Sequence, residues 1–159
     1  MGDLIDEIIL REGGDKVTND PHDTGGRTRF GISETSNPKA WEDGDVTYDE
    51  ARSIYEQKYL KGPGFDKIQD PKLRSVLVDF GVNSGPQLAI MKLQEILRVK
   101  VDGVLGPNTL AAIEKEEPRR LTNKLSLARI KMIGRIVKRD PSQLEYVNGW
   151  LNRAGEFID

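Results

Sequence analysis

Glu12 precedes Gly13 and Gly14, and its type and neighbours suit it for proton-transfer chemistry. Apolar residues recur at helical spacing from Leu4 to Ile9, and a glycine pair is a usual stop signal after a helix. A carboxylate there faces the negative end of the helix dipole, which disfavours its ionised form. We therefore expect Glu12 to keep its proton near neutral pH, as the general acid of glycoside hydrolysis must. The alternative is a solvated residue at a frayed helix end.

The segment after the glycine pair contains further polar groups. Residues 15–36 are rich in Gly, Asp, Asn, Thr and Pro, and the stretch from Thr28 to Ile32 alternates in character. This pattern predicts a loop followed by a small β-hairpin. We expect the hairpin to bring carboxylates and hydroxyls next to the end of the first helix, around one cleft.

The composition leaves carboxylates as the main catalytic groups. The chain has no cysteine, which excludes disulfides, thiolate zinc sites and cysteine nucleophiles. Its one histidine, His22, is too few for the usual zinc hydrolase and could serve only beside a nucleophile. Carboxylates alone can perform glycoside hydrolysis. No metal and no cofactor are expected.

The two halves of the chain differ in charge. Residues 1–70 contain 16 acidic and 9 basic side chains, whereas residues 71–159 contain 10 acidic and 15 basic ones. Between Pro118 and Arg139 there are eight Lys or Arg and no acid. We expect this basic helix, 119–139, to be either solvated or attracted to lipopolysaccharide or an anionic cell-wall polymer. Nucleic-acid binding is not expected, because the whole chain has a net charge of −2.

Local start and stop signals predict a mainly helical fold. A long helix is expected from Arg119 to Lys138. Capping boxes and proline-containing start signals predict further helices that begin at Thr47 (boxed by Glu50), Asp70-Pro71, Gly85-Pro86, Gly106-Pro107 and Ser142 (boxed by Glu145). The predicted class is mainly α, of the α+β type, a helical bundle with one small β-hairpin lining the active-site cleft.

Length and composition favour one globular domain over residues 1–159. The chain is 36% hydrophobic and 31% charged, which is typical of a folded protein that buries a core. No apolar run approaches the roughly 20 residues that a membrane helix needs. The acidic start, residues 1–7, does not resemble a Sec-type signal peptide. We expect synthesis in the host cytoplasm, followed by action in the periplasm or cell wall after release through a holin or another route.

Several motifs resemble glycoside hydrolase family 108, the N-acetylmuramidases of phages and secretion-activator proteins. They are Glu12-Gly13-Gly14, then Asn19-Asp20-Pro21, then Asp23-x-Gly25-Gly26-x-Thr28-x-Phe30-Gly31-Ile32. Three later segments resemble the peptidoglycan-binding half of the same family: Asp79 to Pro86, Leu93-Gln94, and Val101 to Thr109. The resemblance divides the chain into a catalytic region of about residues 1–85 and a helical peptidoglycan-binding half of about residues 86–159.

This resemblance implies a lysozyme-like fold that cleaves the β-1,4 bond between N-acetylmuramic acid and N-acetylglucosamine in peptidoglycan. Glu12 matches the family's catalytic glutamate. By similarity to the wider phage-lysozyme pattern, Asp23 and Thr28 would be its catalytic partners. An aspartate can stabilise the positively charged transition state or orient a water, and a threonine hydroxyl can hold that water.

Other candidate site residues have open alternatives. Asp20 competes with Asp23 as the partner carboxylate and is predicted to bind substrate, although Asp-Pro is also good turn chemistry. Asn83 is predicted to bond a sugar N-acetyl group, or else to cap a helix. Trp41 and Trp150 could stack on sugar rings or lie in the core.

The leading hypothesis is a phage or prophage endolysin, active as a monomer, whose partner is the glycan strand of peptidoglycan. One rival is a lytic transglycosylase, which uses a single glutamate and releases anhydro-muramic products. The other is a non-catalytic protein that binds the cell wall or assists secretion.

Overall fold

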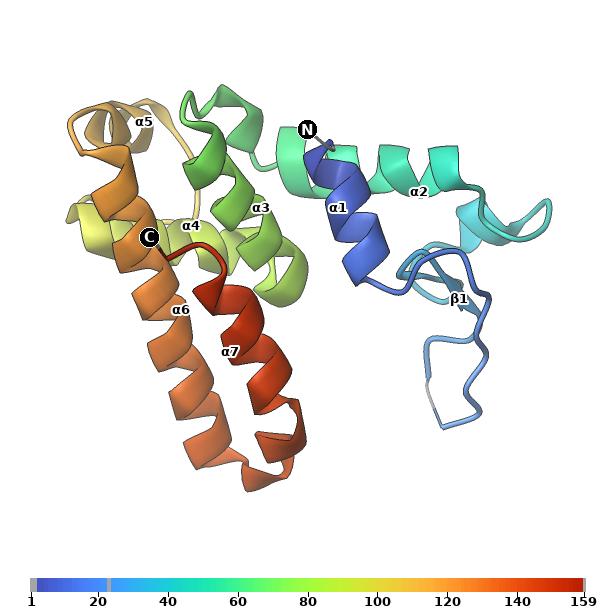
Figure 1. The fold of residues 1–159 in the computed structure, drawn as a ribbon. Coiled ribbons are helices and arrows are strands. Elements are labelled where there is room, and N and C mark those ends of the chain that lie inside the picture. Colours follow the sequence, from blue (N-terminus) through green and yellow to red (C-terminus); the bar gives the residue numbers. More distant parts are fainter. Residues whose placement is uncertain (1–2, 23, 159) are drawn as a thin grey trace. The chain divides into compact units, whose positions relative to one another are not determined.

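A computed structural model describes residues 3–22 and 24–158 and divides the chain into two compact units, residues 1–60 and 61–159. Helices dominate both units, and within the described residues the strands form one two-stranded antiparallel sheet (Figure 1). The predicted mainly α class with one small hairpin is therefore confirmed. The single-domain count stays a prediction.

The first unit consists of short helices around the hairpin. Its core is apolar and includes Ile8, Trp41 and Val46. The elements of this unit are α1 (Leu4–Arg11), β1 (Thr28–Arg29), β2 (Ile32–Ser33), a 3-10 turn η1 (Pro38–Trp41), α2 (Tyr48–Tyr55) and a π-helical continuation η2 (Glu56–Lys61).

Helix α2 begins at the predicted capping box. The Thr47 side chain accepts the Glu50 N–H, and the Glu50 carboxylate accepts the Thr47 N–H at 2.7 Å. The same bonds lower the pKa of Glu50, because they favour its ionised form. Two donors that helix formation leaves without partners are thereby satisfied. The helix packs against α1, where Arg52 pairs with Asp3 and Asp6.

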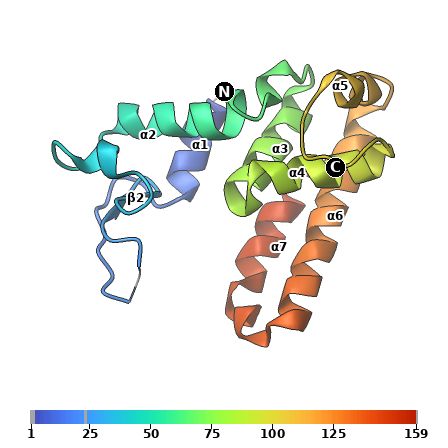
Figure 2. The same ribbon diagram turned by 180° about the vertical axis from the view of Figure 1, so that it is seen from behind.

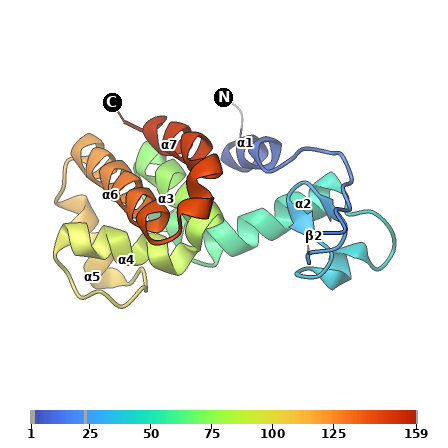
Figure 3. The same ribbon diagram turned by 90° about the horizontal axis from the view of Figure 1, so that it is seen from below.

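The second unit is a helical bundle in which the long helix α6 lies beside α3, α4 and α7 (Figures 2 and 3). Asp70 caps α3 as predicted, accepting the Leu73 N–H at 2.7 Å. Its elements are η3 (Phe65–Lys67), α3 (Pro71–Ser84), α4 (Pro86–Leu97), α5 (Pro107–Glu114), α6 (Pro118–Arg139), η4 (Pro141–Tyr146) and α7 (Val147–Gly155).

One buried ionic cluster links three helices of this bundle. The carboxylate of Asp79 on α3 accepts hydrogen bonds from Arg129 on α6 at 2.7 Å and from Arg153 on α7 at 2.8 Å. The Asp79 and Arg129 side chains are almost fully buried. Removing one partner of such a pair leaves a buried charge uncompensated, so the cluster fixes which helices lie together.

The predicted capping box at Ser142 and Glu145 is wrong. Asp140 is the cap: it accepts the Ser142 N–H at 3.2 Å and the Ser142 hydroxyl at 2.6 Å. Proline at position 141 starts a 3-10 turn, and the α-helix begins only at Val147. The Glu145 carboxylate instead hydrogen-bonds the Tyr146 hydroxyl and raises the pKa of that phenol.

Among the described residues, no helix combines the length and the apolar content that crossing a bilayer requires.

Candidate active site

Glu12 lies at the C-terminal end of α1, as predicted. Its N–H donates to the Ile8 carbonyl at 3.0 Å, and its backbone leaves the helical path at φ −83° and ψ 4°. The helix is anchored on the apolar face formed by Ile5, Ile8 and Ile9, each at most 2% exposed. Burial of such a side chain contributes about 1.5–3 kcal/mol, so the position of Glu12 is set by the core beneath it.

The glycine pair turns the chain from the helix toward the hairpin. Gly13 has φ +131° and Gly14 has φ +64°, conformations that side chains disfavour. The Gly14 carbonyl then accepts the Phe30 N–H at 2.8 Å. This bond ties the end of α1 directly to the turn of the β-hairpin.

The hairpin turn lies against Glu12. Thr28 pairs with Ser33 and Arg29 with Ile32, which leaves Phe30 and Gly31 as a two-residue turn. Both turn residues have positive φ, +53° and +75°, as a type I′ turn requires. A Cβ atom added to Gly31 would lie 2.7 Å from the Glu12 Cβ and 3.3 Å from the Glu12 carbonyl oxygen. The hairpin turn can therefore approach Glu12 this closely only because residue 31 is a glycine.

Tyr55 of α2 supports the same turn from another side. Its hydroxyl donates to the Phe30 carbonyl at 3.0 Å, and the side chain is buried. The hydroxyl also lies against the Cα of Gly31, where an added Cβ would collide with it. Three elements, α1, the hairpin and α2, thus meet at Gly31.

We predict that Tyr55→Phe lowers the free energy of unfolding by about 1–2 kcal/mol, because the buried Phe30 carbonyl loses a hydrogen bond. Denaturant unfolding measures this change. Tyr59→Phe is the matched control, because Tyr59 is more exposed than Tyr55 and its ring contacts Tyr55 at a centroid distance of 5.6 Å. An equal effect of the two substitutions would contradict a supporting role for the Tyr55 hydroxyl.

A polar hollow of about 190 Å³ opens beside the turn. A larger hollow of about 570 Å³ adjoins it and shares Ser36, Asn37 and Ile54 with it. Hydroxyl, amide and ammonium groups are the usual partners of sugar hydroxyls and acetamido groups. The side chains that could offer such groups in the smaller hollow are those of Ser33, Ser36, Asn37, Tyr55, Lys58 and Tyr59.

Thr28 is held in place through its backbone. Its N–H and carbonyl pair with Thr18, at 2.8 Å and 2.9 Å, in an isolated antiparallel bridge. Arg29 reaches the same connection and donates to the Asp15 carbonyl at 2.7 Å. The connection from Asp15 to Thr18 therefore runs beside β1 as an additional extended segment.

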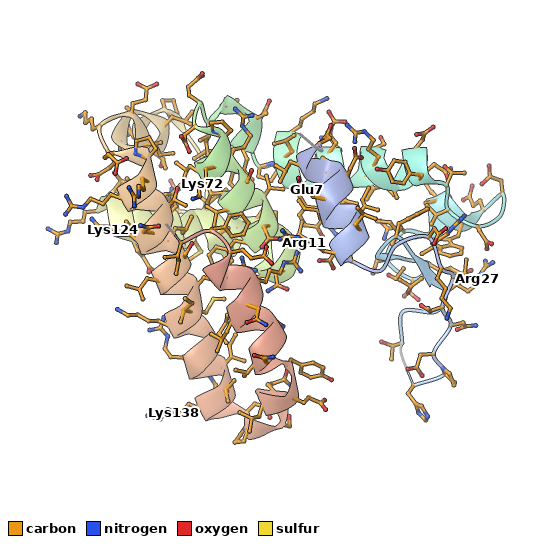
Figure 4. The ribbon with its side chains drawn as sticks, in the orientation of Figure 1. Glu7, Arg11, Arg27, Lys72, Lys124 and Lys138 are labelled. Carbon is orange, nitrogen blue, oxygen red and sulfur yellow. The ribbon has the colours of Figure 1, made fainter. Side chains whose placement is uncertain are left out.

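An ion pair fixes the base of the hairpin. Arg27 bonds Glu34 through two nitrogens, at 3.0 Å and 2.9 Å, and its guanidinium lies 4.7 Å above the Trp41 ring (Figure 4 labels Arg27). The hydrogen bonds from Arg27 lower the pKa of the Glu34 carboxyl. Trp41 is only 4% exposed and therefore lies in the core. The predicted alternative, that its ring stacks on a sugar, is wrong.

The loop that contains the acidic candidates is only partly described. Asp20 is exposed, and its carboxylate accepts the His22 N–H at 2.9 Å, which is turn chemistry. Its predicted substrate contact stays a prediction. Asp23 lies outside the described residues, so its proposed partnership with Glu12 also stays a prediction.

Comparisons with known proteins agree with this geometry. The family model described as Glycosyl hydrolase 108 matches residues 5–85, and a model described as Predicted Peptidoglycan domain matches residues 88–155. The chain belongs to glycosyl hydrolase family 108. It is also similar to a solved structure titled "Structure of Brucella abortus SagA", at 29% identity and a TM-score of 0.77, over 97% of this chain and 88% of that one. A search of curated proteins finds no match.

Membership of family 108 makes this chain a glycoside hydrolase that acts on peptidoglycan, with a lysozyme-like fold. The predicted division at about residue 85 into a catalytic region and a peptidoglycan-binding half stays a prediction.

In the peptidoglycan-binding half of this family 108 protein, the buried Gln94 amide organises the turn at Asp102 and Gly103. Gln94 accepts both backbone N–H groups, at 3.0 Å and 2.9 Å, and donates to the Asp102 carboxylate at 2.8 Å and to the Thr109 hydroxyl at 3.1 Å. The bond from the Gln94 amide to the Asp102 carboxylate lowers the pKa of that carboxyl. The Gln94 side chain therefore holds together the segment from Val101 to Thr109, which resembles the family motif.

Asn83 lies in the last turn of α3, in the second unit, and is exposed. The cap of that helix is Gly85, whose N–H donates to the Gly81 carbonyl at 2.8 Å, so the capping alternative for Asn83 is wrong. Its contact with a sugar N-acetyl group stays a prediction.

Trp150 is partly exposed and its ring centroid lies 5.8 Å from that of Tyr146.

Sequence reasoning missed two residues at the centre of the site. In the sequence, Gly31 stands out only as part of a motif, because Phe-Gly is not one of the dipeptides, such as Asn-Gly or Asp-Gly, that signal a two-residue hairpin turn. Tyr55 is not among the sequence candidates, because nothing local indicates that its hydroxyl reaches Phe30, 25 positions away.

Proposed function

We propose that this hydrolase is an N-acetylmuramidase of the lysozyme type, which cleaves the β-1,4 bond between N-acetylmuramic acid and N-acetylglucosamine. Glu12 is its general acid, Asp23 stabilises positive charge or assists a water, and Thr28 positions that water. The supporting observation is the contact of Glu12 with the Gly31 turn, at the edge of a polar hollow. In this proposal, the Glu12 carboxyl acts on a sugar held in the hollow that Gly31 lines, because glycoside hydrolysis needs a proton donor beside the scissile bond.

In this proposal, a sugar ring next to the scissile bond occupies the hollow of about 190 Å³, and the adjoining larger hollow accepts the continuing glycan. Tyr59 and Asn37 offer groups that can bond hydroxyl or acetamido oxygens there. Asp20 and, in the second unit, Asn83 are proposed as further substrate contacts. No cofactor or metal is part of the proposed reaction.

The proposed biological setting is a phage or prophage endolysin, acting as a bacteriolytic monomer. Because its substrate lies outside the cytoplasmic membrane, we propose that it acts in the periplasm or cell wall after release through a holin or another route. The basic helix α6, residues 118–139, is proposed to attract lipopolysaccharide or an anionic wall polymer.

Product analysis tests the proposed reaction. Mass spectrometry of muropeptides released from purified sacculi is expected to show reducing N-acetylmuramic acid ends. A lytic transglycosylase would give 1,6-anhydro ends, which are lighter by one water. A protein that only binds the wall would sediment with sacculi without releasing fragments. Either of these two results would contradict the proposal.

A further inference from the structure

The helical hairpin formed by α6 and α7 ends in a tip that projects from the second unit. Figures 1 and 2 both show the distal half of α6, the turn η4 and the start of α7 extending beyond α3 and α4. We define the hairpin tip as residues 138–151. It comprises the last residues of α6, all of η4 and the first half of α7.

The hairpin tip exposes large apolar side chains. Leu144 is 65% exposed, Tyr146 51% and Leu151 37%. The Tyr146 and Trp150 rings are in contact, with centroids 5.8 Å apart and planes inclined by 30°. Single exposed leucines are common on protein surfaces, but several apolar groups gathered at one projecting end indicate an interaction site.

Basic residues surround this apolar group. Lys131, Arg135, Lys138 and Arg139 are all exposed on the distal half of α6, and Figure 4 shows Lys138 at the end of that helix.

The two acidic side chains of the hairpin tip are engaged locally. Asp140 accepts the N–H and hydroxyl of Ser142, and Glu145 accepts the Tyr146 hydroxyl. These bonds do not remove the negative charges, but residues 131–151 carry four basic and two acidic side chains, which leaves a net charge of +2 beside the exposed apolar groups.

We propose that the hairpin tip docks peripherally onto an anionic phospholipid surface. Leucine, tyrosine and tryptophan side chains enter the boundary between headgroups and acyl chains, while lysine and arginine side chains pair with lipid phosphates. A soluble anionic polysaccharide would match the cations but would offer nothing to the exposed Leu144. This inference goes beyond the proposed hydrolysis and does not depend on it.

Vesicle flotation with the full chain tests the docking. We expect binding to vesicles of phosphatidylglycerol and phosphatidylcholine, and little binding to phosphatidylcholine alone. The double variant Leu144→Ser/Tyr146→Ser is expected to weaken binding about tenfold or more, because it removes the groups that enter the bilayer. Circular dichroism with thermal unfolding checks that this variant remains folded.

Two matched variants separate the hairpin tip from general properties of the surface. Val104→Ser alters an apolar residue that is 62% exposed elsewhere in the same unit and should leave vesicle binding unchanged. Lys138→Gln/Arg139→Gln should weaken binding more than Arg119→Gln/Arg120→Gln, which removes the same charge at the other end of α6.

Trp150 should shift its fluorescence to shorter wavelength on vesicles, and Trp150→Phe should abolish the shift.

Three results would overturn the proposal. The first is equal vesicle binding by the unchanged protein and the Leu144→Ser/Tyr146→Ser variant. The second is equal binding to charged and neutral vesicles. The third is a dimer of the unchanged protein in light scattering that the double variant dissociates, because a second copy of the chain would then be the partner of the hairpin tip.

Discussion

Glu12→Gln is expected to lower the rate of peptidoglycan cleavage by about 100- to 10,000-fold, the usual contribution of a general acid. Glutamine has nearly the same shape as glutamic acid but has no proton to donate to the leaving oxygen. The folded structure should be preserved, because the helix end depends on the Glu12 backbone bond to Ile8 and on the buried isoleucines of α1. Release of reducing ends from sacculi measures the rate, and circular dichroism with thermal unfolding measures the fold.

Glu7→Gln is the matched control for this prediction. Glu7 is an exposed carboxylate on the same helix, in its first turn, and Figure 4 labels it there. It should keep nearly all activity, since it lies at the opposite end of α1 from the hairpin. Full activity of Glu12→Gln, or equal losses in the two variants, would end the assignment of Glu12 as the acid.

The second large effect is expected from Gly31→Ala. A Cβ at this position would lie 2.7 Å from the Glu12 Cβ and would collide with the Tyr55 hydroxyl, in a backbone conformation of φ +75°. The turn or Glu12 must move, and displacement of a catalytic group by about 1 Å can cost about 100-fold in rate. We expect a loss of that order in kcat, together with destabilisation of about 1–3 kcal/mol from strain and overpacking.

Gly26→Ala provides the comparison, because it separates strain from displacement of Glu12. Gly26, two residues before β1, has nearly the same φ, +70°, but the nearest atom to an added Cβ is 3.4 Å away, on Glu34. Gly26→Ala should lower the stability of the protein, but its loss of kcat should be much smaller than that of Gly31→Ala. Adding Tyr55→Phe to Gly31→Ala removes one of the two collisions and should restore part of the activity. Equal kcat for the two alanine variants would refute a positioning role for Gly31.

Much of the secondary structure follows from local signals in the sequence. The Thr47–Glu50 capping box, the Asp70-Pro71 start and the glycines after Glu12 all act within a few residues, so the sequence predicts the helix boundaries correctly. The Ser142 capping box failed for an equally local reason. Asp140 before a proline is a competing cap, and the Glu145 carboxylate bonds Tyr146 instead.

By itself, the sequence determined the position of Glu12 at a helix end, the hairpin that follows it and the family, because each depends on neighbouring residues or an ordered motif. Only the tertiary structure decided that Gly31 lies against Glu12, that Tyr55 bonds the Phe30 carbonyl, and that Asp79 pairs with Arg129, 50 positions away. These contacts join segments whose separation in sequence implies nothing about their separation in space. They form because burial of the cores brings the segments together, and buried polar groups must then find partners.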